Sequence, residues 1–412
     1  MKIRFFFVAL LCFCKLFSQQ KDLNYFLLKA QKNSPLLFDL KNQIRTNSFD
    51  SLLLRAGYKP QINANAFANY APIIDSLGYD TAVTNGQTLT ALIGIRKNII
   101  PKSVTNSQAN SYRIIKEGLI LNRKIALKDL NKAITSQYIS ASGTLEQISY
   151  NQKIETLLKD EGQILKKLTQ NSVYKQTDYL IFLSTIKAQE YTVLQYKQQY
   201  QTDLGLLNYL SGEVDSTTVK LSKPIIELKT TLKPEKSIFF KSFEIDSLRF
   251  QNQNKLIDNA YKPQFAVLAD AGYLSSFALK PYRNFGFSLG AGFSIPIFDG
   301  GQRSLNHQRI GVALETNLAY KNNFLKQYQQ QLLLLHQKLK QAKSLQIQLQ
   351  SQVQIVETLI AAHKKLLVTG DAQITEYVLA LGNLIAIKNG ISQNEINTLQ
   401  LINEINYWKS NE

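Results

Sequence analysis

The sequence contains very little sulfur. Both cysteines, Cys12 and Cys14, lie close to the amino terminus, and Met1 is the only methionine in 412 residues. The rest of the chain therefore has no thiol for a disulfide bond or for a thiolate metal site. The lack of methionine and cysteine also argues against a special role in handling soft metals such as copper.

Long hydrophobic runs are missing as well. The apolar run at residues 5–14 is about half as long as the roughly 20 residues that a membrane-spanning helix needs. Lys2 and Arg4 precede this run, and a short polar segment follows it. This order is typical of a cleavable secretory signal. We therefore expect residues 1–18 to be a signal peptide and the exported chain to begin near Gln19.

Acidic residues are scarce relative to basic ones, with 30 Asp and Glu against 48 Lys and Arg and a formal charge of +18. A basic chain can bind nucleic acid or anionic membrane surfaces. Because the expected signal would direct the chain out of the cytoplasm, the chain would meet membrane lipid and other envelope surfaces before any nucleic acid. We therefore expect no nucleic acid partner.

No catalytic constellation is present in the sequence. It has no Walker-type phosphate loop, no nucleophile elbow and no His-Glu zinc helix. His307 and His336 would be roughly 40 Å apart on one helix, and His363 lies further along, so the histidines cannot form one metal site. We expect a protein that is not an enzyme, with no catalytic residue, cofactor or metal.

Residues 284–301 show strict alternation. Apolar residues, most of them large, occupy the odd positions from Phe285 to Ile295, and small residues occupy the even positions, which is the period of a β-strand. The small residues are Gly286, Ser288, Gly290, Gly292 and Ser294. The run is about as long as a tilted strand needs to cross a bilayer, roughly 9–11 residues. A long helical pattern follows it directly.

The same order of elements is predicted twice. The tetrapeptide Tyr58-Lys59-Pro60-Gln61 recurs as Tyr261-Lys262-Pro263-Gln264, which marks an internal repeat. The first repeat, 19–212, has a helix over about 22–57, strands at about 61–70 and 88–99, a long helix with Gly143 as a candidate kink, a tip turn at 170–176 and a return helix. An irregular connection, 213–236, follows. The second repeat, 237–412, has a helix, strands at about 264–273 and 284–297, a long helix, a tip turn at 369–374 and a last helix.

The predicted strands and helices limit the possible architectures. Each long helix would reach roughly 100 Å at 1.5 Å per residue, which suggests a tall helical cylinder. Four strands cannot close into a barrel, and open edges are not tolerated in lipid. A dimer would supply eight strands and a trimer twelve. An eight-stranded barrel is filled by its own side chains, so the small even residues favour a trimer in which they face an open pore.

With these features the chain resembles the TolC family of outer membrane efflux proteins over essentially its whole exported length. The resemblance is carried by the duplicated order, by the strand exit at 294–301, and by tip turns at 171–178 and 369–376. It implies a mixed α and β fold in which a trimeric twelve-stranded barrel in the outer membrane continues into a periplasmic α-helical barrel. It further implies a passive exit duct for efflux or type I secretion, which docks a periplasmic adaptor (membrane fusion) protein and, through it, an inner membrane transporter.

The resemblance also implies roles for particular residues. The adaptor-docking tips would be Ser172, Thr177, Asp178, Gly370, Thr375 and Glu376. The joint between barrel and tunnel would comprise Pro101, Pro296, Asp299, Gly300 and Gly301. Ser172 and Glu376 depart from the glycine and aspartate usual in the family. Thr177 and Thr375 are also expected to cap the return helices. A secreted or periplasmic coiled-coil scaffold without a pore remains the alternative function.

Overall fold

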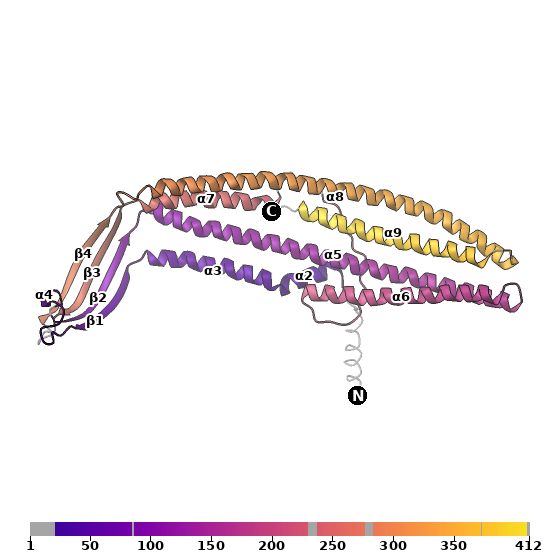
Figure 1. The fold of residues 1–412 in the computed structure, drawn as a ribbon, viewed down its shortest axis with the longest axis horizontal. Helices are drawn as coiled ribbons and strands as arrows, with labels where there is room; N and C mark the ends of the chain where they lie inside the picture. Colours follow the sequence, from indigo (N-terminus) through magenta and orange to yellow (C-terminus); the bar gives the residue numbers. More distant parts are fainter. Residues whose placement is uncertain (1–20, 85, 230–236, 277–282, 372, 410–412) are drawn as a thin grey trace, which may run out of the picture. The chain divides into compact units, whose positions relative to one another are not determined.

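The computed structural model describes residues 21–84, 86–229, 237–276, 283–371 and 373–409. The predicted signal peptide lies outside these residues, as does part of the predicted connection 213–236. The elements in chain order are α2 (Leu23–Asn33), α3 (Pro35–Gly57), β1 (Gln61–Tyr70), α4 (Thr81–Thr84), β2 (Gln87–Ile99), α5 (Lys102–Gln170), α6 (Gln176–Ser211), η2 (Ile238–Phe240), α7 (Lys241–Ala260), β3 (Gln264–Ser275), β4 (Phe285–Ser294), α8 (Gln302–Thr369) and α9 (Ile374–Trp408). Figure 1 shows these elements along the chain. The predicted mixed α and β fold with four strands is confirmed.

The chain divides into two compact units. The strand unit comprises Asp39–Arg123 and Phe240–Asn323, and the helical unit comprises Met1–Phe38, Lys124–Phe239 and Phe324–Glu412. The strand unit holds the sheet, α7 and the sheet-proximal parts of α3, α5 and α8. The helical unit holds α2, α6, α9 and the remaining parts of the long helices.

The strand unit contains one antiparallel sheet in the order β1-β2-β3-β4, which lies beyond the ends of α3, α5, α7 and α8 (Figure 1). Gln61 of β1 pairs with Arg96 of β2, and Phe265 of β3 pairs with both Ile99 of β2 and Phe293 of β4. The register joins the two predicted repeats, because β2 of the first pairs with β3 of the second. The outer edges of β1 and β4 have no partner strand in the described part of the chain.

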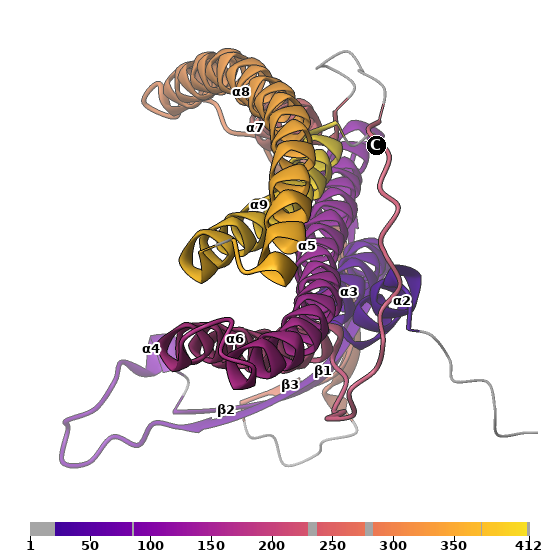
Figure 2. The ribbon, with the colours of Figure 1, turned by 90° about the vertical axis from the view of Figure 1, so that its right-hand side faces the viewer.

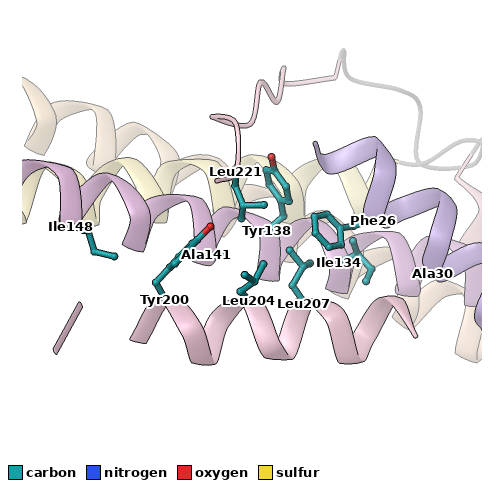
Figure 3. Packing of buried hydrophobic residues seen from close by; sticks show 10 residues of the cluster. All are labelled: Phe26, Ala30, Ile134, Tyr138, Ala141, Ile148, Tyr200, Leu204, Leu207 and Leu221. Carbon is teal, nitrogen blue, oxygen red and sulfur yellow. The ribbon is translucent and has the colours of Figure 1, made fainter. Parts of the chain in front are cut away.

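At least three apolar clusters hold the helical unit together, and the smallest packs Leu335 and Leu339 of α8 against Ile405 of α9. In the first, α2, α5 and α6 and the segment after α6 bury side chains that include Phe26, Tyr138, Leu207 and Leu221 (Figure 3). The second cluster joins α5 and α6 to α9 through Leu158, Phe182 and Tyr377. Figure 2 shows α6 beside α5 and α9 beside α8. Each long helix is thus packed against its own return helix.

Asparagine side chains cross-link the helices in both units. In each case the amide donates to a main-chain carbonyl of a neighbouring helix, at 2.8–3.2 Å. The pairs are Asn47 with Tyr112, Asn252 with Ser107, Asn259 with Ser103, Asn317 with Phe243, Asn394 with Ala342, and Asn403 with Lys132. Buried amides need such partners, so these bonds fix which helix faces meet.

Several helix boundaries correct the sequence-based expectations. The predicted single helix over 22–57 is two helices, because Pro35 has no amide hydrogen and Ser34 begins α3 by accepting from Leu37 N through its hydroxyl (3.3 Å). The predicted kink at Gly143 is absent from α5, which runs unbroken through that residue. A Cβ at this glycine would lie only 2.3 Å from Ile396 Cδ1 of α9, so the glycine allows close helix packing.

Candidate functional site: a two-faced sheet, its joint and two helical tips

One face of the sheet is covered with large apolar side chains. Residues that lie directly opposite in an antiparallel register share a face, and the register places Phe285, Phe287, Leu289 and Phe293 of β4 on the same face as Val267 of β3 and the isoleucines of β2. Phe287 is 81% exposed and Leu289 is 77% exposed. This apolar face therefore has no covering layer among the residues that the structure describes.

Aromatic residues lie at both ends of the apolar face. Phe265 and Phe293 form a ring pair at the end next to the helices, with centroids 4.7 Å apart. Tyr273 and Phe285 are paired near the other end. Phe285 and Phe293 are separated by roughly 27 Å along the strand, and a tilt of about 40° would reduce this to a height near 20 Å. That height is close to the apolar band of outer-membrane barrels.

The opposite face is mostly small and polar, although Phe67 of β1, Leu92 of β2, and Leu268 and Leu274 of β3 also lie on it. It carries all five predicted pore-facing residues of β4, namely Gly286, Ser288, Gly290, Gly292 and Ser294, opposite even-numbered residues of β3. On β2 and β1 the same face carries Arg96, Asn98, Gln61, Asn63 and Asn65. Ser288 Oγ donates to Asp270 Oδ2 at 2.6 Å. The polar and charged side chains of the sheet thus lie mainly on this face.

The predicted joint is built around Asp299. Its carboxylate accepts from Tyr261 Oη (2.5 Å), Arg303 N (2.7 Å) and Gly301 N (2.9 Å). The bond from Tyr261, followed by those from the main chain, lowers the pKa of Asp299. Gly300 and Gly301 have φ of +66° and +84°, a conformation that glycine adopts without steric cost. The joint residues therefore turn the chain sharply into α8.

Two smaller features complete the joint. The carbonyl of Pro101 accepts from Val104 N at 3.0 Å and so starts α5 immediately after β2. Pro296 lies just beyond β4, which ends at Ser294 and is therefore shorter than the predicted strand 284–297. Proline cannot donate to a strand ladder, which agrees with the early end of β4.

Both helical tips have the same backbone geometry. Ser172 and Gly370 have φ of +64° and +83°. In each turn the next amide reaches back to the carbonyl five residues earlier, from Val173 to Leu168 and from Asp371 to Leu366, both at 3.0 Å. This is the Schellman arrangement of a helix end. Ser172 therefore adopts the same left-handed conformation as Gly370 in spite of its side chain.

The predicted tip residues are mostly exposed, but two capping roles were wrong. Thr177, Thr375 and Glu376 are exposed, and Asp178 is half-buried. The N-cap positions are Lys175 and Gln373, which precede Thr177 and Thr375 by two residues. Asp178 instead accepts from Lys175 N at 3.1 Å, the reciprocal half of a capping box. The threonines therefore lie inside the first helical turn.

The two tips contact each other directly. Tyr174 Oη donates to the carbonyl of Leu367 at 3.1 Å, and a Cβ at Gly370 would lie 3.1 Å from Val173 Cγ1. Behind the tips, the buried carboxylate of Glu161 accepts a hydrogen bond from Tyr377 and pairs with Lys364 at 3.3 Å. Burial and the bond to Glu161 raise the pKa of Tyr377. The tips are therefore held as one surface.

Sequence reasoning missed the polar contacts behind these sites. The Glu161–Tyr377 bond and the Tyr261–Asp299 bond join residues far apart in the chain, and no spacing rule reveals them. The repeated Tyr-Lys-Pro-Gln motif was the available signal for Tyr261.

None of the described helices combines the length and apolar character needed to cross a bilayer. Among the described residues, no group of three or more His, Cys, Asp or Glu side chains is placed to hold a metal ion.

Comparison with known proteins identifies the fold. No protein-family model matches the sequence, and no curated protein matches it. The outer membrane protein VceC from Vibrio cholerae has 13% identity and a TM-score of 0.76, covering 94% of this chain and 96% of that chain. CusC has 10% identity and a TM-score of 0.78, covering 95% and 92%. The open state of the Neisseria gonorrhoeae MtrE outer membrane channel has 11% identity and a TM-score of 0.75, covering 94% and 88%.

These structures have the architecture that the sequence resemblance predicted, and the chain therefore has a TolC-like fold. The prediction of this fold is confirmed.

Proposed function

We propose that this chain is one subunit of a trimeric outer-membrane duct for efflux or type I secretion. The observation that carries the proposal is the sheet, which has one exposed apolar face, one polar face and two outer edges without partner strands. Four such strands fit one third of the wall of a twelve-stranded barrel, with lipid on one side and a water-filled lumen on the other.

Closure of the barrel between copies follows from the open edges. Unpaired strand edges in a bilayer leave amide and carbonyl groups unsatisfied, which costs several kcal/mol per group. Pairing β1 of one copy with β4 of the next satisfies both edges. Three copies would supply twelve strands, and the glycine-rich polar face would then line the lumen.

Cell fractionation tests this location. Outer membranes are separated from soluble periplasm without detergent, and the chain is followed by immunoblotting. The proposal predicts recovery with the outer membrane, resistance to extraction by high salt, and protease sensitivity limited to exposed segments. Recovery in the soluble periplasm would refute the duct and favour a coiled-coil scaffold.

We further propose that the helical tips dock a periplasmic adaptor linked to an inner membrane transporter. The tip surface comprises Ser172, Thr177, Asp178, Gly370, Thr375 and Glu376. Support comes from the matching Schellman turns of the two hairpins and from the exposure of most of these side chains. The two repeats, 19–212 and 237–412, would each contribute one tip, joined by the connection 213–236. Transport energy would come from the transporter, since the duct is passive.

Site-specific crosslinking tests the docking surface. A photoreactive residue is best placed at Asp371, because substitution of Gly370 would strain a left-handed backbone and crowd Val173. The matched control carries the same residue at Tyr209, an exposed position at the other end of α6. We expect capture of an adaptor from Asp371 in intact cells and not from Tyr209. Equal capture from both positions, or from neither, would contradict the docking role.

A further inference from the structure

A cavity of about 370 Å³ lies in the strand unit where the polar face of the sheet meets the start of α5. Its wall combines polar-face residues of the strands, the apolar-face residues Ile99, Phe265 and Phe293, and residues of the helix–strand connections. The polar and charged lining residues are Arg96, Asn98, Gln108, Asn259, Lys262, Gln264 and Ser294. We call this space the joint cavity.

The joint cavity carries positive charge without a compensating acid. Arg96 and Lys262 are its two charged residues, and no Asp or Glu occurs among the described residues that line it. Within the described chain neither cation forms an ion pair with a carboxylate. Asp270 lies on the same face of the sheet, but it is two residues further from the joint and accepts from Ser288.

Neutral hydrogen bonds position both cations. Arg96 Nε donates to Asn98 Oδ1 at 3.2 Å, and Asn98 lies two residues closer to α5 on the same face. Lys262 Nζ donates to Ser103 Oγ at 2.7 Å, in the first turn of α5. A guanidinium and an ammonium held by neutral groups retain their full charge and most of their donor capacity. The arrangement is suited to an anionic group.

We propose that the joint cavity binds anionic groups, such as carboxylate, sulfonate or phosphate, on solutes that pass through the lumen. The inference rests on the proposed trimeric duct, in which three copies of Arg96 and Lys262 form a ring at the base of the barrel. At physiological salt the field of such charges extends about 8 Å, so it acts on solutes in a narrow lumen. Rings of cationic side chains are a known basis of anion selectivity.

Reversal potentials of the purified full-length assembly in planar bilayers test the inference. Under a potassium chloride gradient, wild-type protein should favour chloride over potassium. Arg96→Gln combined with Lys262→Gln should lower this preference several-fold, since local counter-ion enrichment depends on the field. Inorganic phosphate should reduce the chloride current of the wild type and have much less effect on the double variant.

Lys97→Gln is the matched control. Lys97 is adjacent to Arg96 on β2 but lies on the apolar face, where its ammonium donates to the carbonyl of Tyr58. This variant removes one positive charge per copy from the opposite face, against two for the double variant, and should leave the ion preference unchanged. A normal current with equal ion preference in all three proteins would overturn the anion site while leaving the duct intact. Absence of any current in the wild type would refute the duct and this inference together.

Discussion

Aromatic residues are buried in the helical cores and exposed on the sheet. Phe182 and Tyr377 stack in the helical unit and are each 1% exposed, whereas Phe287 on the sheet is 81% exposed. The helices bury their cluster residues against one another and satisfy buried amides across helix pairs, although they also carry exposed apolar residues such as Ile347 and Leu379. The large side chains on the apolar face of the sheet stay exposed in the described part of the chain. The helical unit thus has apolar cores of its own, whereas in the proposed duct lipid and further copies would complete the sheet.

The largest effect should come from a charge on the apolar face. Phe287→Lys would place an ammonium in lipid, at a cost of about 2–4 kcal/mol per chain near the bilayer midplane. We expect the protein to disappear from the outer membrane fraction. Ser288→Lys, one residue further on and on the polar face, should be recovered there in near-normal amount. Equal loss of the two variants would show that the two faces do not differ as proposed.

A cavity in the helical core should have the next largest effect. Leu207 is fully buried between α2, α5 and α6, so Leu207→Ala should lower the free energy of unfolding by about 2–5 kcal/mol. Urea unfolding followed by far-ultraviolet circular dichroism measures this. Leu194→Ala, at an exposed position on the same helix, should change it by less than about 0.5 kcal/mol. A similar loss at Leu194 would mean that another copy covers that position.

Alanine substitutions at two glycines in the helical unit should change its stability in opposite directions. Gly143→Ala should destabilise by about 1–3 kcal/mol, because its methyl group would meet Ile396 at 2.3 Å. Nothing lies within 4 Å of a Cβ at Gly205 in the described structure. Gly205→Ala should therefore stabilise α6 by about 0.5–1 kcal/mol. Thermal unfolding of the two variants in parallel gives the comparison, and the same sign for both would contradict the packing role of Gly143.

The smallest effect concerns the stability that the helical unit loses at alkaline pH. Burial, assisted by Glu357, raises the pKa of Tyr150 to about 12 from an ordinary value near 10. The folded state thus favours the neutral phenol. The contribution of Tyr150 to stability is complete below about pH 10 and is lost as the pH rises to about 12. Tyr150 Oη is buried without a hydrogen-bond partner among the described residues.

The Tyr150→Phe variant should therefore be as stable as the wild type at pH 8. It should lose less stability than the wild type between pH 10 and pH 12. Urea midpoints at a series of pH values provide the measurement. Tyr191→Phe, at an exposed tyrosine on α6, should retain the alkaline loss of the wild type. A Tyr150→Phe profile identical to that of the wild type would rule out Tyr150 as a contributor.

Periodicity predicted the parts of the fold that depend on one element at a time. The alternation of β4 predicted a strand with a small-residue face, because a period of two places those residues on one side regardless of partners. The break at Ser34 was missed since the apolar spacing continues across Pro35. The capping roles of Thr177 and Thr375 were wrong because composition marks a helix start to within only one or two residues.

Features that depend on two distant elements could not be predicted. Gly143 looked like a kink, but its role depends on Ile396 of another helix. Lys262 was noted only as part of a repeated tetrapeptide, but its ammonium contacts Ser103, which is 159 residues away. The cavity that Lys262 lines with Arg96 depends on the register of β2 with β3. Such contacts are properties of the folded chain.

The most direct test of closure between copies is a disulfide scan of the two open edges. No cysteine follows Cys14 in the sequence, so Asn65→Cys on β1 can be combined in turn with Gly286→Cys, Ser288→Cys, Gly290→Cys and Gly292→Cys on β4. Within one copy these strands are separated by two others, roughly 14 Å away, which is beyond disulfide reach. A Gly94→Cys and Asp270→Cys pair, opposite each other in the register, provides the intrachain control. The duct predicts oxidised dimers and trimers at one β4 register, and monomers only at every register would contradict it.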